Sequence, residues 1–293
     1  MGHELKGVAM SSLVRPLVSS LRRSLKGRGL DALNALIAQI FSANEQGAFY
    51  VPKPIVNGTQ ALFQDAAGTV PVTADGDPAG LMVDQSPNSN NAAQSVSSQR
   101  PVYQTDGTLH WLLPDGVGDN LNVGLALDHE EFTLVTSYRA GNDNQRVFDN
   151  RGTGAPGDAK GWQIKARNDI GDIVTFDDGA GNAVQWSGDD PSTTSPGLDE
   201  YVVITIAYQS GQVIYRINGV DQGAPRVITG GGLAAMGSIV TGIDGLLFTA
   251  RNVIGTQSFD GRFYGGVLVN KYLGTSDIEN TESYFASLAG VTL

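Results

Sequence analysis

The sequence predicts a mainly β protein: a β-sandwich preceded by a helical arm and followed by a short C-terminal helix. Three observations favour this fold class. Apolar residues fall into many short runs, the chain holds 38 glycines and 12 prolines, and only 17% of its residues are charged. Such a turn-rich composition is typical of antiparallel β domains. The length of 293 residues could provide two average domains. Single sandwiches of about 200–250 residues are also common, so length alone leaves the domain count open.

The first 44 residues are expected to form a separate helical arm for attachment or oligomerisation. Leu13–Lys26 has apolar residues at helical spacing, and Gly27 and Gly29 then interrupt the pattern. A second helical run follows, with apolar residues three, four and three positions apart. This seam favours docking on another protein or a dimer or trimer neck; the alternative is that it folds back on its own sandwich. The proposed docking residues are Val14, Leu17, Leu21, Leu25, Leu30, Leu33, Ile37 and Ile40.

Beyond Gly47 the pattern changes from helical to alternating, which is typical of β-strands. The Tyr201–Tyr208 and Val213–Ile217 runs predict a hairpin, and the second run leads into Asn218-Gly219, a pair that favours positive φ. The other predicted strands are Phe132–Tyr138, Trp162–Ala166, Gly245–Arg251 and Phe263–Asn270.

The chain is expected to end in a short helix. Ser276 and Glu279 have the spacing of a capping box, and Gly290 provides a C-terminal stop. We expect Ile278, Phe285 and Leu288 to face inward and the helix to cover one end of the sandwich. Long glycine- and aspartate-rich loops, including Ala74–Arg100, are the expected binding surfaces.

Charge and composition exclude several classes of partner. Residues 1–30 carry six basic residues and one acidic residue, a net charge of +5, and the remainder carries 13 basic and 29 acidic residues, a net charge of −16. An acidic body repels nucleic acid, whereas the basic arm is either a solvated helix face or a contact for an acidic surface. The chain has no cysteine and no apolar run of about 20 residues, so we expect a soluble protein made in a reducing cytoplasm, without a membrane span.

Four segments resemble the concanavalin A-like (laminin G-like) jelly-roll domains of tailed-bacteriophage structural proteins. They are Glu45–Asp84, Arg100–Leu121, the hairpin YVVITIAYQSGQVIYRINGV and Gly261–Leu293. The resemblance covers residues 45–293 and implies a virion structural protein, made in a host bacterial cytoplasm. The resemblance implies a head decoration, fibre, spike or tail component. Such a protein is expected to be a homo-oligomer, in particular a trimer, that contacts capsid, collar or tail proteins. A calcium site of the laminin G-like type is doubtful, because Asn120 stands where many relatives have the second of two acidic residues.

No catalytic pattern accompanies this resemblance. The sandwich class includes glycan hydrolases, but their E-x-D-x-E strand is absent, and Glu130 and Glu131 would point to opposite faces of a strand. The three histidines are far apart, and no phosphate-binding loop or nucleophile elbow occurs. We therefore expect a protein that is not an enzyme and needs no cofactor.

Two kinds of binding site remain as hypotheses. Asp115 and Asp119 are weak candidates for calcium, as are Asp169, Asp172, Asp177 and Asp178, although aspartates in glycine-rich turns are more often turn formers. A host-glycan adhesin would need exposed aromatic rings beside polar loops. The candidates for this role are Trp186, Tyr103 and Trp162, although Trp111 and Trp162 lie in strand-like alternation that also fits a core position.

Overall fold

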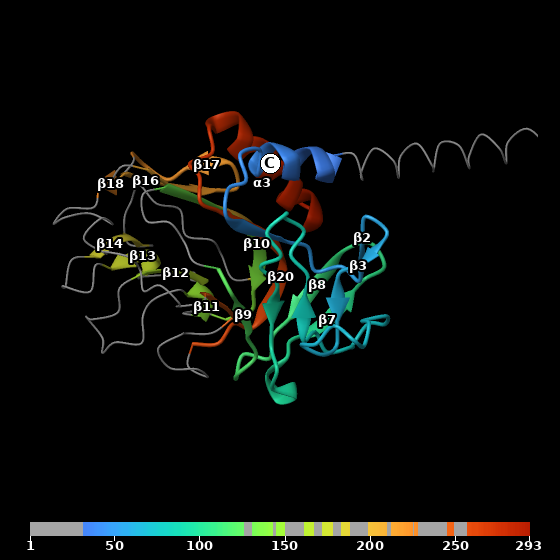
Figure 1. The fold of residues 1–293 in the computed structure, drawn as a ribbon. Helices are drawn as coiled ribbons and strands as arrows, with labels where there is room; N and C mark the ends of the chain where they lie inside the picture. The colour runs from blue at the N-terminus through green and yellow to red at the C-terminus, as the bar shows by residue number, and fades with distance from the viewer. Residues whose placement is uncertain are drawn as a thin grey trace, which may run out of the picture.

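The computed structural model describes residues 32–125, 131–142, 145–149, 161–166, 172–177, 183–187, 199–209, 212–224, 226–227, 245–248 and 257–293 (Figure 1). These residues form two large antiparallel sheets packed face to face, with helices on the outer side of one of them. The fold class predicted from the sequence is confirmed.

The first sheet has the order β17-β16-β15-β10-β20-β8-β7, with β1 added on β20 and β18 on β16. Its strands are β1 (Gly47–Tyr50), β7 (Val102–Thr105), β8 (His110–Leu113), β10 (Glu131–Ala140), β15 (Tyr201–Gln209), β16 (Gln212–Ile217), β17 (Val220–Asp221), β18 (Arg226–Val227) and β20 (Gly261–Val269).

The second sheet has the order β14-β13-β12-β11-β19-β9-β6-β5-β4. Its strands are β4 (Leu62–Phe63), β5 (Leu81–Met82), β6 (Ala92–Ala93), β9 (Leu121–Val123), β11 (Gln145–Asp149), β12 (Gly161–Ala166), β13 (Asp172–Asp177), β14 (Ala183–Ser187) and β19 (Gly245–Leu247). A small hairpin, β2 (Ile55–Val56) with β3 (Thr59–Gln60), and a 3₁₀ turn, η1 (Ser97–Gln99), complete the strands and turns.

The predicted strands coincide with β10, β12, β15, β16, β19 and β20. Alternation along β10 explains why: Leu134 and Tyr138 face the second sheet, whereas Val135 faces the opposite side. The β15–β16 hairpin also forms as expected, and Asn218 and Gly219 have φ of 48° and 78°.

The main core lies between the sheets and is rich in aromatic rings. Trp162 is fully buried, and its ring stacks on Phe132 and Phe148 at centroid distances of 5.3 and 4.7 Å. This stack joins β10 in the first sheet to β11 and β12 in the second. Burial of such rings is the main driving force that holds a cysteine-free sandwich together.

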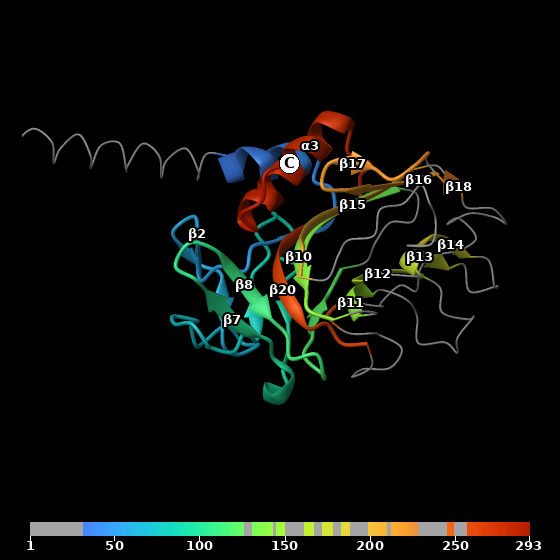
Figure 2. The ribbon, with the colours of Figure 1, turned by 180° about the vertical axis from the view of Figure 1, so that it is seen from behind.

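A second cluster covers the outer face, by which we mean the side of the first sheet that points away from the second. The helix of residues 32–40 and α3 (Thr275–Leu288) lie beside each other there, as both views show (Figures 1 and 2). The Gln39 side-chain amide donates to the Asp277 carboxylate, and Lys271 forms a 2.8 Å ion pair with Glu45. Residues 32–44 therefore pack with the sandwich, which places the described end of the predicted 1–44 arm on the 45–293 domain.

Two details of α3 differ from the sequence prediction. The helix begins at Thr275, its N-cap is Gly274, and no side chain caps it, so the predicted capping box with Ser276 is wrong. The helix covers the outer face of the first sheet rather than one end of the sandwich. Ile278 and Phe285 are buried and Leu288 is half-buried, as expected, and Gly290 has the positive φ of 73° that a C-terminal stop requires.

Candidate binding site

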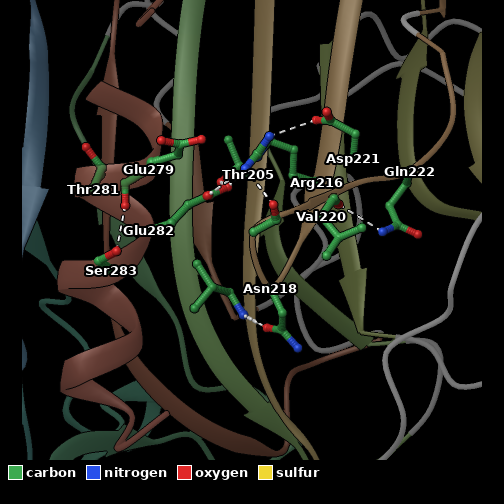
Figure 3. Close-up of polar contacts among 12 residues, drawn as sticks. Thr205, Arg216, Asn218, Val220, Asp221, Gln222, Glu279, Thr281, Glu282 and Ser283 are labelled. Atoms are coloured by element: carbon green, nitrogen blue, oxygen red, sulfur yellow. Dashed lines mark hydrogen bonds and ion pairs between the residues drawn. The ribbon is translucent and has the colours of Figure 1, made fainter. Parts of the chain in front are cut away.

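A buried polar cluster fixes α3 on the outer face (Figure 3). Glu282 of α3 is 1% exposed and accepts hydrogen bonds from Arg216 Nε at 2.9 Å and from Thr205 Oγ1 at 2.7 Å. Arg216 also reaches Asp221 at 2.9 Å through Nη1. Because a buried carboxylate is stable only when it is paired and hydrogen-bonded, this cluster fixes the position of α3 along the sheet.

The last turn of α3 thereby lies over a change of partner along β20. One edge of β20 pairs with β1 from Gly266 to Val269, and with β8 at Phe263. Tyr264 and Gly265 lie between these two pairings, beside a bulge in the β10–β20 register. Gly265 is required there, since a Cβ atom would lie 2.6 Å from the Tyr50 carbonyl oxygen. The change of partner leaves a recess beside Tyr264.

This recess is a cavity of about 100 Å³ lined by residues of β8, β20, the segment after β1 and the end of α3. Its exposed members are Lys53, Thr108 and Ser287, and His110 is a half-buried member. The other lining residues are Val51, Pro52, Leu109, Tyr264 and Leu288. A cavity with an apolar base and a few convergent polar groups is the usual form of a small-ligand site. We call it the rim pocket.

Aromatic rings and arginines continue from the rim pocket across the outer face. The Tyr264 ring lies 6.1 Å from Trp111 and 5.8 Å from Tyr201, measured between centroids. The Arg262 guanidinium carbon lies 4.4 Å from the centre of the Trp111 ring, and that of Arg139 lies 5.5 Å from the centre of Tyr201. Stacking of this kind leaves the N–H edge of a guanidinium open to an acceptor.

The two arginines differ in their ionic partners. Arg139 forms a 3.0 Å ion pair with Asp199. Arg262 forms no ion pair with the described residues, and neither does Lys53 at the mouth of the rim pocket. Asp106 lies near enough to Arg262 for its pKa to be lowered, chiefly by hydrogen bonds from the Leu109 and Thr108 amides and to a lesser extent by Arg262. Lys53 therefore lines the pocket, and Arg262 and Asp106 lie near it.

Tyr103 orients the imidazole of the rim pocket. The Tyr103 hydroxyl and His110 Nδ1 are 2.6 Å apart, and the two rings stack at 5.9 Å. Burial and the charge of Lys53 lower the pKa of His110, against a smaller opposing effect of Asp106. The imidazole is therefore neutral near pH 7, and with Tyr103 donating to Nδ1 its proton lies on Nε2.

The Tyr264 hydroxyl is buried at the base of this region, beside Arg262 and Tyr201. Burial raises the pKa of Tyr264 to about 12, although a hydrogen bond with Arg262 opposes the rise. The neighbouring Trp111 Nε1 is buried without a hydrogen-bond partner among the described residues. The groups that the pocket offers to a ligand are therefore the exposed polar side chains of its lining, Lys53, Thr108 and Ser287.

The structure excludes two of the three sugar-platform candidates named from the sequence. Trp162 is 0% exposed and lies in the aromatic core. A core position was the alternative interpretation of its strand-like alternation. Tyr103 is 3% exposed, and its ring stacks on His110, so it offers no free face to a sugar. The side chain of Trp186, the third candidate, lies outside the described residues.

Of the predicted docking residues, three lie in the described part of the chain. Leu33 and Ile40 are 5% and 0% exposed and pack in the outer-face cluster with Phe49 and Phe285, and Ile37 packs partly against it. The alternative of folding back on the sandwich is therefore correct for Leu33 and Ile40, and their assignment to docking is wrong. Five of these residues lie outside the described part of the chain: Val14, Leu17, Leu21, Leu25 and Leu30.

Asp115 and Asp119 lie together in the loop before β9, and one carboxylate oxygen of each accepts backbone hydrogen bonds. Asp115 Oδ1 accepts hydrogen bonds from the amides of Val117, Gly118 and Asp119 at 2.8, 3.0 and 3.2 Å. Asp119 Oδ2 accepts one from the Asp115 amide at 3.0 Å. This is the turn-forming role. Within the described residues, no group of three or more acidic or histidine side chains could hold a metal ion.

Asp172 and Asp177 bound β13, and their side chains lie outside the described residues, as do Asp169, Asp178 and Glu130. Glu131 begins β10 and accepts a hydrogen bond from the Gln209 side-chain amide at 3.2 Å. None of the described helices is long and apolar enough to cross a bilayer.

Few local sequence patterns point to the rim pocket. Tyr264 lies in the predicted strand Phe263–Asn270, and Arg262 directly precedes that strand. Because the two residues are two positions apart, alternation places them on the same face, and this is the only local pattern that marks them. Lys53 and Thr108 lie in loops, and no sequence pattern brings those two loops together. His110 is half-buried, and its ring stacks on Tyr103.

No protein-family model matches the sequence, and no curated protein matches it. Solved structures do resemble the fold. A botulinum neurotoxin serotype D ligand binding domain in complex with N-acetylneuraminic acid aligns with 13% identity and a TM-score of 0.50, over 87% of this chain and 52% of that one. A single-residue mutant of the domain HCR/D aligns with 14% identity and a TM-score of 0.51, over 84% and 52%.

The chain shares the β-sandwich fold of these domains. A sialidase from Trypanosoma rangeli in complex with sialic acid is also similar, with 15% identity and a TM-score of 0.48 over 88% of this chain and 39% of that one. The chain spans about half the length of the two binding-domain structures. At these identities the likeness establishes the fold and nothing finer.

Proposed function

We propose that the protein is a glycan-binding β-sandwich without catalytic activity, and that the rim pocket is its binding site. The observation that carries this proposal is the pocket itself: a cavity of about 100 Å³ that is lined by Tyr264 and by the exposed polar side chains of Lys53, Thr108 and Ser287. Around it lie Lys53, Thr108, His110 and Ser287, which supply the hydrogen-bonding groups that sugar hydroxyls need.

Two further facts support the proposal. The serotype D domain of similar fold is described as a ligand binding domain and was solved with N-acetylneuraminic acid. The described residues offer no pair of carboxylates in the rim pocket that could act as acid and base on a glycosidic bond. Binding without hydrolysis is the function that this arrangement serves.

The size of the pocket restricts the mode of binding. Sites for drug-sized ligands measure about 300–1,000 Å³. A cavity of about 100 Å³ admits one substituent or the edge of one ring. The remainder of a glycan would lie across the outer face, over Tyr201 and the stacked arginines. We therefore expect recognition of a terminal residue.

The test is a glycan array followed by calorimetric titration of the best binders on the wild type and on Tyr264→Phe. The variant removes only the hydroxyl, and we expect it to weaken binding at least about fivefold without loss of stability. Tyr138→Phe is the matched control, because the Tyr138 hydroxyl is also buried but lies in the inner core. An array without binders, or equal affinities for wild type and Tyr264→Phe, would overturn the proposal.

We also propose, as a second function, a place on a bacteriophage particle as a homo-oligomeric decoration, fibre or tail component. The four segments that resemble virion proteins support it, together with the basic, apolar-periodic residues 13–30. Since Leu33 and Ile40 are buried in the protein's own sandwich, the proposed attachment surface narrows to Val14, Leu17, Leu21, Leu25 and Leu30. Deletion of residues 1–30 should abolish assembly onto particles and leave the sandwich folded; a truncated protein that still assembled would refute this role.

A further inference from the structure

The polar groups left unused around the rim pocket are mainly hydrogen-bond donors. Lys53 lines the pocket, is exposed and has no ion pair within the described residues. Arg262, which is next but one to the lining residue Tyr264, has no ion pair there either. Thr108 and Ser287 add exposed hydroxyls to the lining. A ligand that pairs with the two cations must bring an acceptor group with negative charge.

We infer that the rim pocket selects glycans with an anionic substituent, a carboxylate or a sulfate, over neutral ones. This inference rests on the proposed function, because it names the class of ligand for the same pocket. The anionic substituent would enter the cavity, and the neutral part of the glycan would remain outside it.

The charges near the pocket favour an anion although the protein as a whole is acidic. The chain carries a net charge of −11. Lys53 lines the pocket and Arg262 lies close by, and the nearby negative charges are those of Asp106 and Asp75. Both carboxylates accept backbone hydrogen bonds, Asp106 from the Thr108 and Leu109 amides and Asp75 from the Thr105 amide. Arg262 stacks on Trp111 and interacts with the Tyr264 hydroxyl, which holds the guanidinium beside the pocket.

The C-terminal end of α3 is a further opposing influence, because a helix carries a partial negative charge at its C-terminus. Ser287 and Leu288 of that last turn line the pocket. However, the last carbonyls already accept hydrogen bonds: Ala286 from Val291 at 2.9 Å and Ser287 from Gly290 at 3.3 Å. The helix end amounts to about half a charge and is partly satisfied. The two full charges of Lys53 and Arg262 therefore outweigh the helix end.

The experiment compares a glucuronate-terminated disaccharide with its glucose-terminated counterpart, together with inorganic sulfate, by calorimetric titration of the full-length protein. We expect the acidic disaccharide to bind at least about tenfold more tightly than the neutral one, and we expect this preference to weaken as salt is raised. Lys53→Met, which keeps the length of the side chain, should reduce the preference to less than about twofold, whereas Lys53→Arg should keep it.

Each result has a distinct meaning. Equal binding of the two disaccharides overturns the inference and leaves the proposed glycan function in place. Sulfate binding that depends on Lys53, without binding of either disaccharide, supports an anion site and overturns the glycan function. Binding of none of the three probes overturns both. An acid preference that survives in Lys53→Met and in Arg262→Gln overturns the assignment to this pocket.

Discussion

Glu282 of α3 and Arg216 of β16 form an ion pair of 2.9 Å at which both side chains are almost entirely removed from water, with exposures of 1% and 10%. Thr205 completes the cluster from the neighbouring strand. Burial of an unpaired charge is costly, so removal of either Glu282 or Arg216 alone should destabilise the protein.

Glu282→Ala should therefore lower the free energy of unfolding by about 3–5 kcal/mol, because Arg216 keeps its charge and loses its main partner. Denaturant titration followed by circular dichroism measures this change. The double variant Glu282→Leu with Arg216→Met should cost less than the two single changes added together, since it leaves no buried unpaired charge behind and the Asp221 carboxylate that loses Arg216 is 62% exposed. A loss of less than about 1 kcal/mol in Glu282→Ala would show that the pair does not hold the helix.

Asp119 predicts a pH dependence of stability. Burial, and next the negative charge of Asp115, raise the pKa of Asp119 to about 6. An aspartate in the unfolded chain has a pKa near 3.9, so between about pH 4 and 6 the folded protein binds more protons, and stability falls as pH rises through this range. Asp119→Asn should remove this component and stabilise the protein at pH 7 by about 1 kcal/mol, because the amide oxygen can still accept from Asp115 N–H. Thermal melts at pH 4.5 and 7 compare the two proteins, and an unchanged difference between the two pH values would contradict the assignment.

Gly47 predicts a steric requirement at the start of β1. A Cβ atom at this position would lie 2.3 Å from the Leu268 carbonyl oxygen and 2.9 Å from the Phe41 ring. Gly47→Ala should therefore destabilise the protein by about 1–3 kcal/mol, as overpacking does. Gly124→Ala is the control, since nothing lies within 4 Å of its Cβ position. Equal melting temperatures for the two variants would show that the strand adjusts freely.

His110 predicts that binding of an acidic glycan strengthens as pH falls. Its pKa is lowered in the free protein by burial and by Lys53. A bound anion favours the imidazolium, so the complex takes up a proton and affinity rises from pH 7.5 to 5.5. In the free protein the sign is opposite: stability is lost as pH falls below the ordinary histidine pKa, because the unfolded chain protonates more readily. In His110→Gln the affinity should no longer vary over this range; titrations at both pH values test it.

Trp162 predicts a structural role without a binding role. Trp162→Ala removes the ring that stacks between Phe132 and Phe148, and it should cost about 3–5 kcal/mol. At a temperature where the variant is folded, its glycan affinity should equal that of the wild type. A loss of glycan affinity in a variant that is still folded would contradict this prediction and show that Trp162 contributes to binding.

The sequence was a good guide to the strands and a poor one to the pocket. Alternation along Phe132–Tyr138 and Tyr201–Tyr208 specifies which side chains face the core, because a one-residue slip would reverse every one of them. The same alternation could not distinguish core aromatic residues such as Trp162 from exposed ones, since it identifies a face without saying what covers it. Helical spacing likewise identified Leu33 and Ile40 as one apolar face but could not say that the partner is the chain's own sheet.

The pocket depends on the change of strand partner along β20, which no local sequence pattern predicts. Lys53 and His110 are 57 positions apart and meet only because β1 and β8 share one edge of β20 in succession. The pairing of Arg216 with Glu282 is equally remote in sequence. Contacts of this kind follow from the order of strands in the sheet, which is decided by the packing of the whole sandwich.

The stacking of Arg262 on Trp111 also supplies an optical reporter. The Trp111 indole lies under a guanidinium, one residue from the rim pocket lining, and its emission will change when an anion binds beside that cation. Trp162, packed against Phe132 and Phe148, will keep the emission of a dry interior. Once Trp186 is replaced by phenylalanine, these two remaining indoles serve as sensor and internal reference, and occupancy can be followed in solution without a dye or a label.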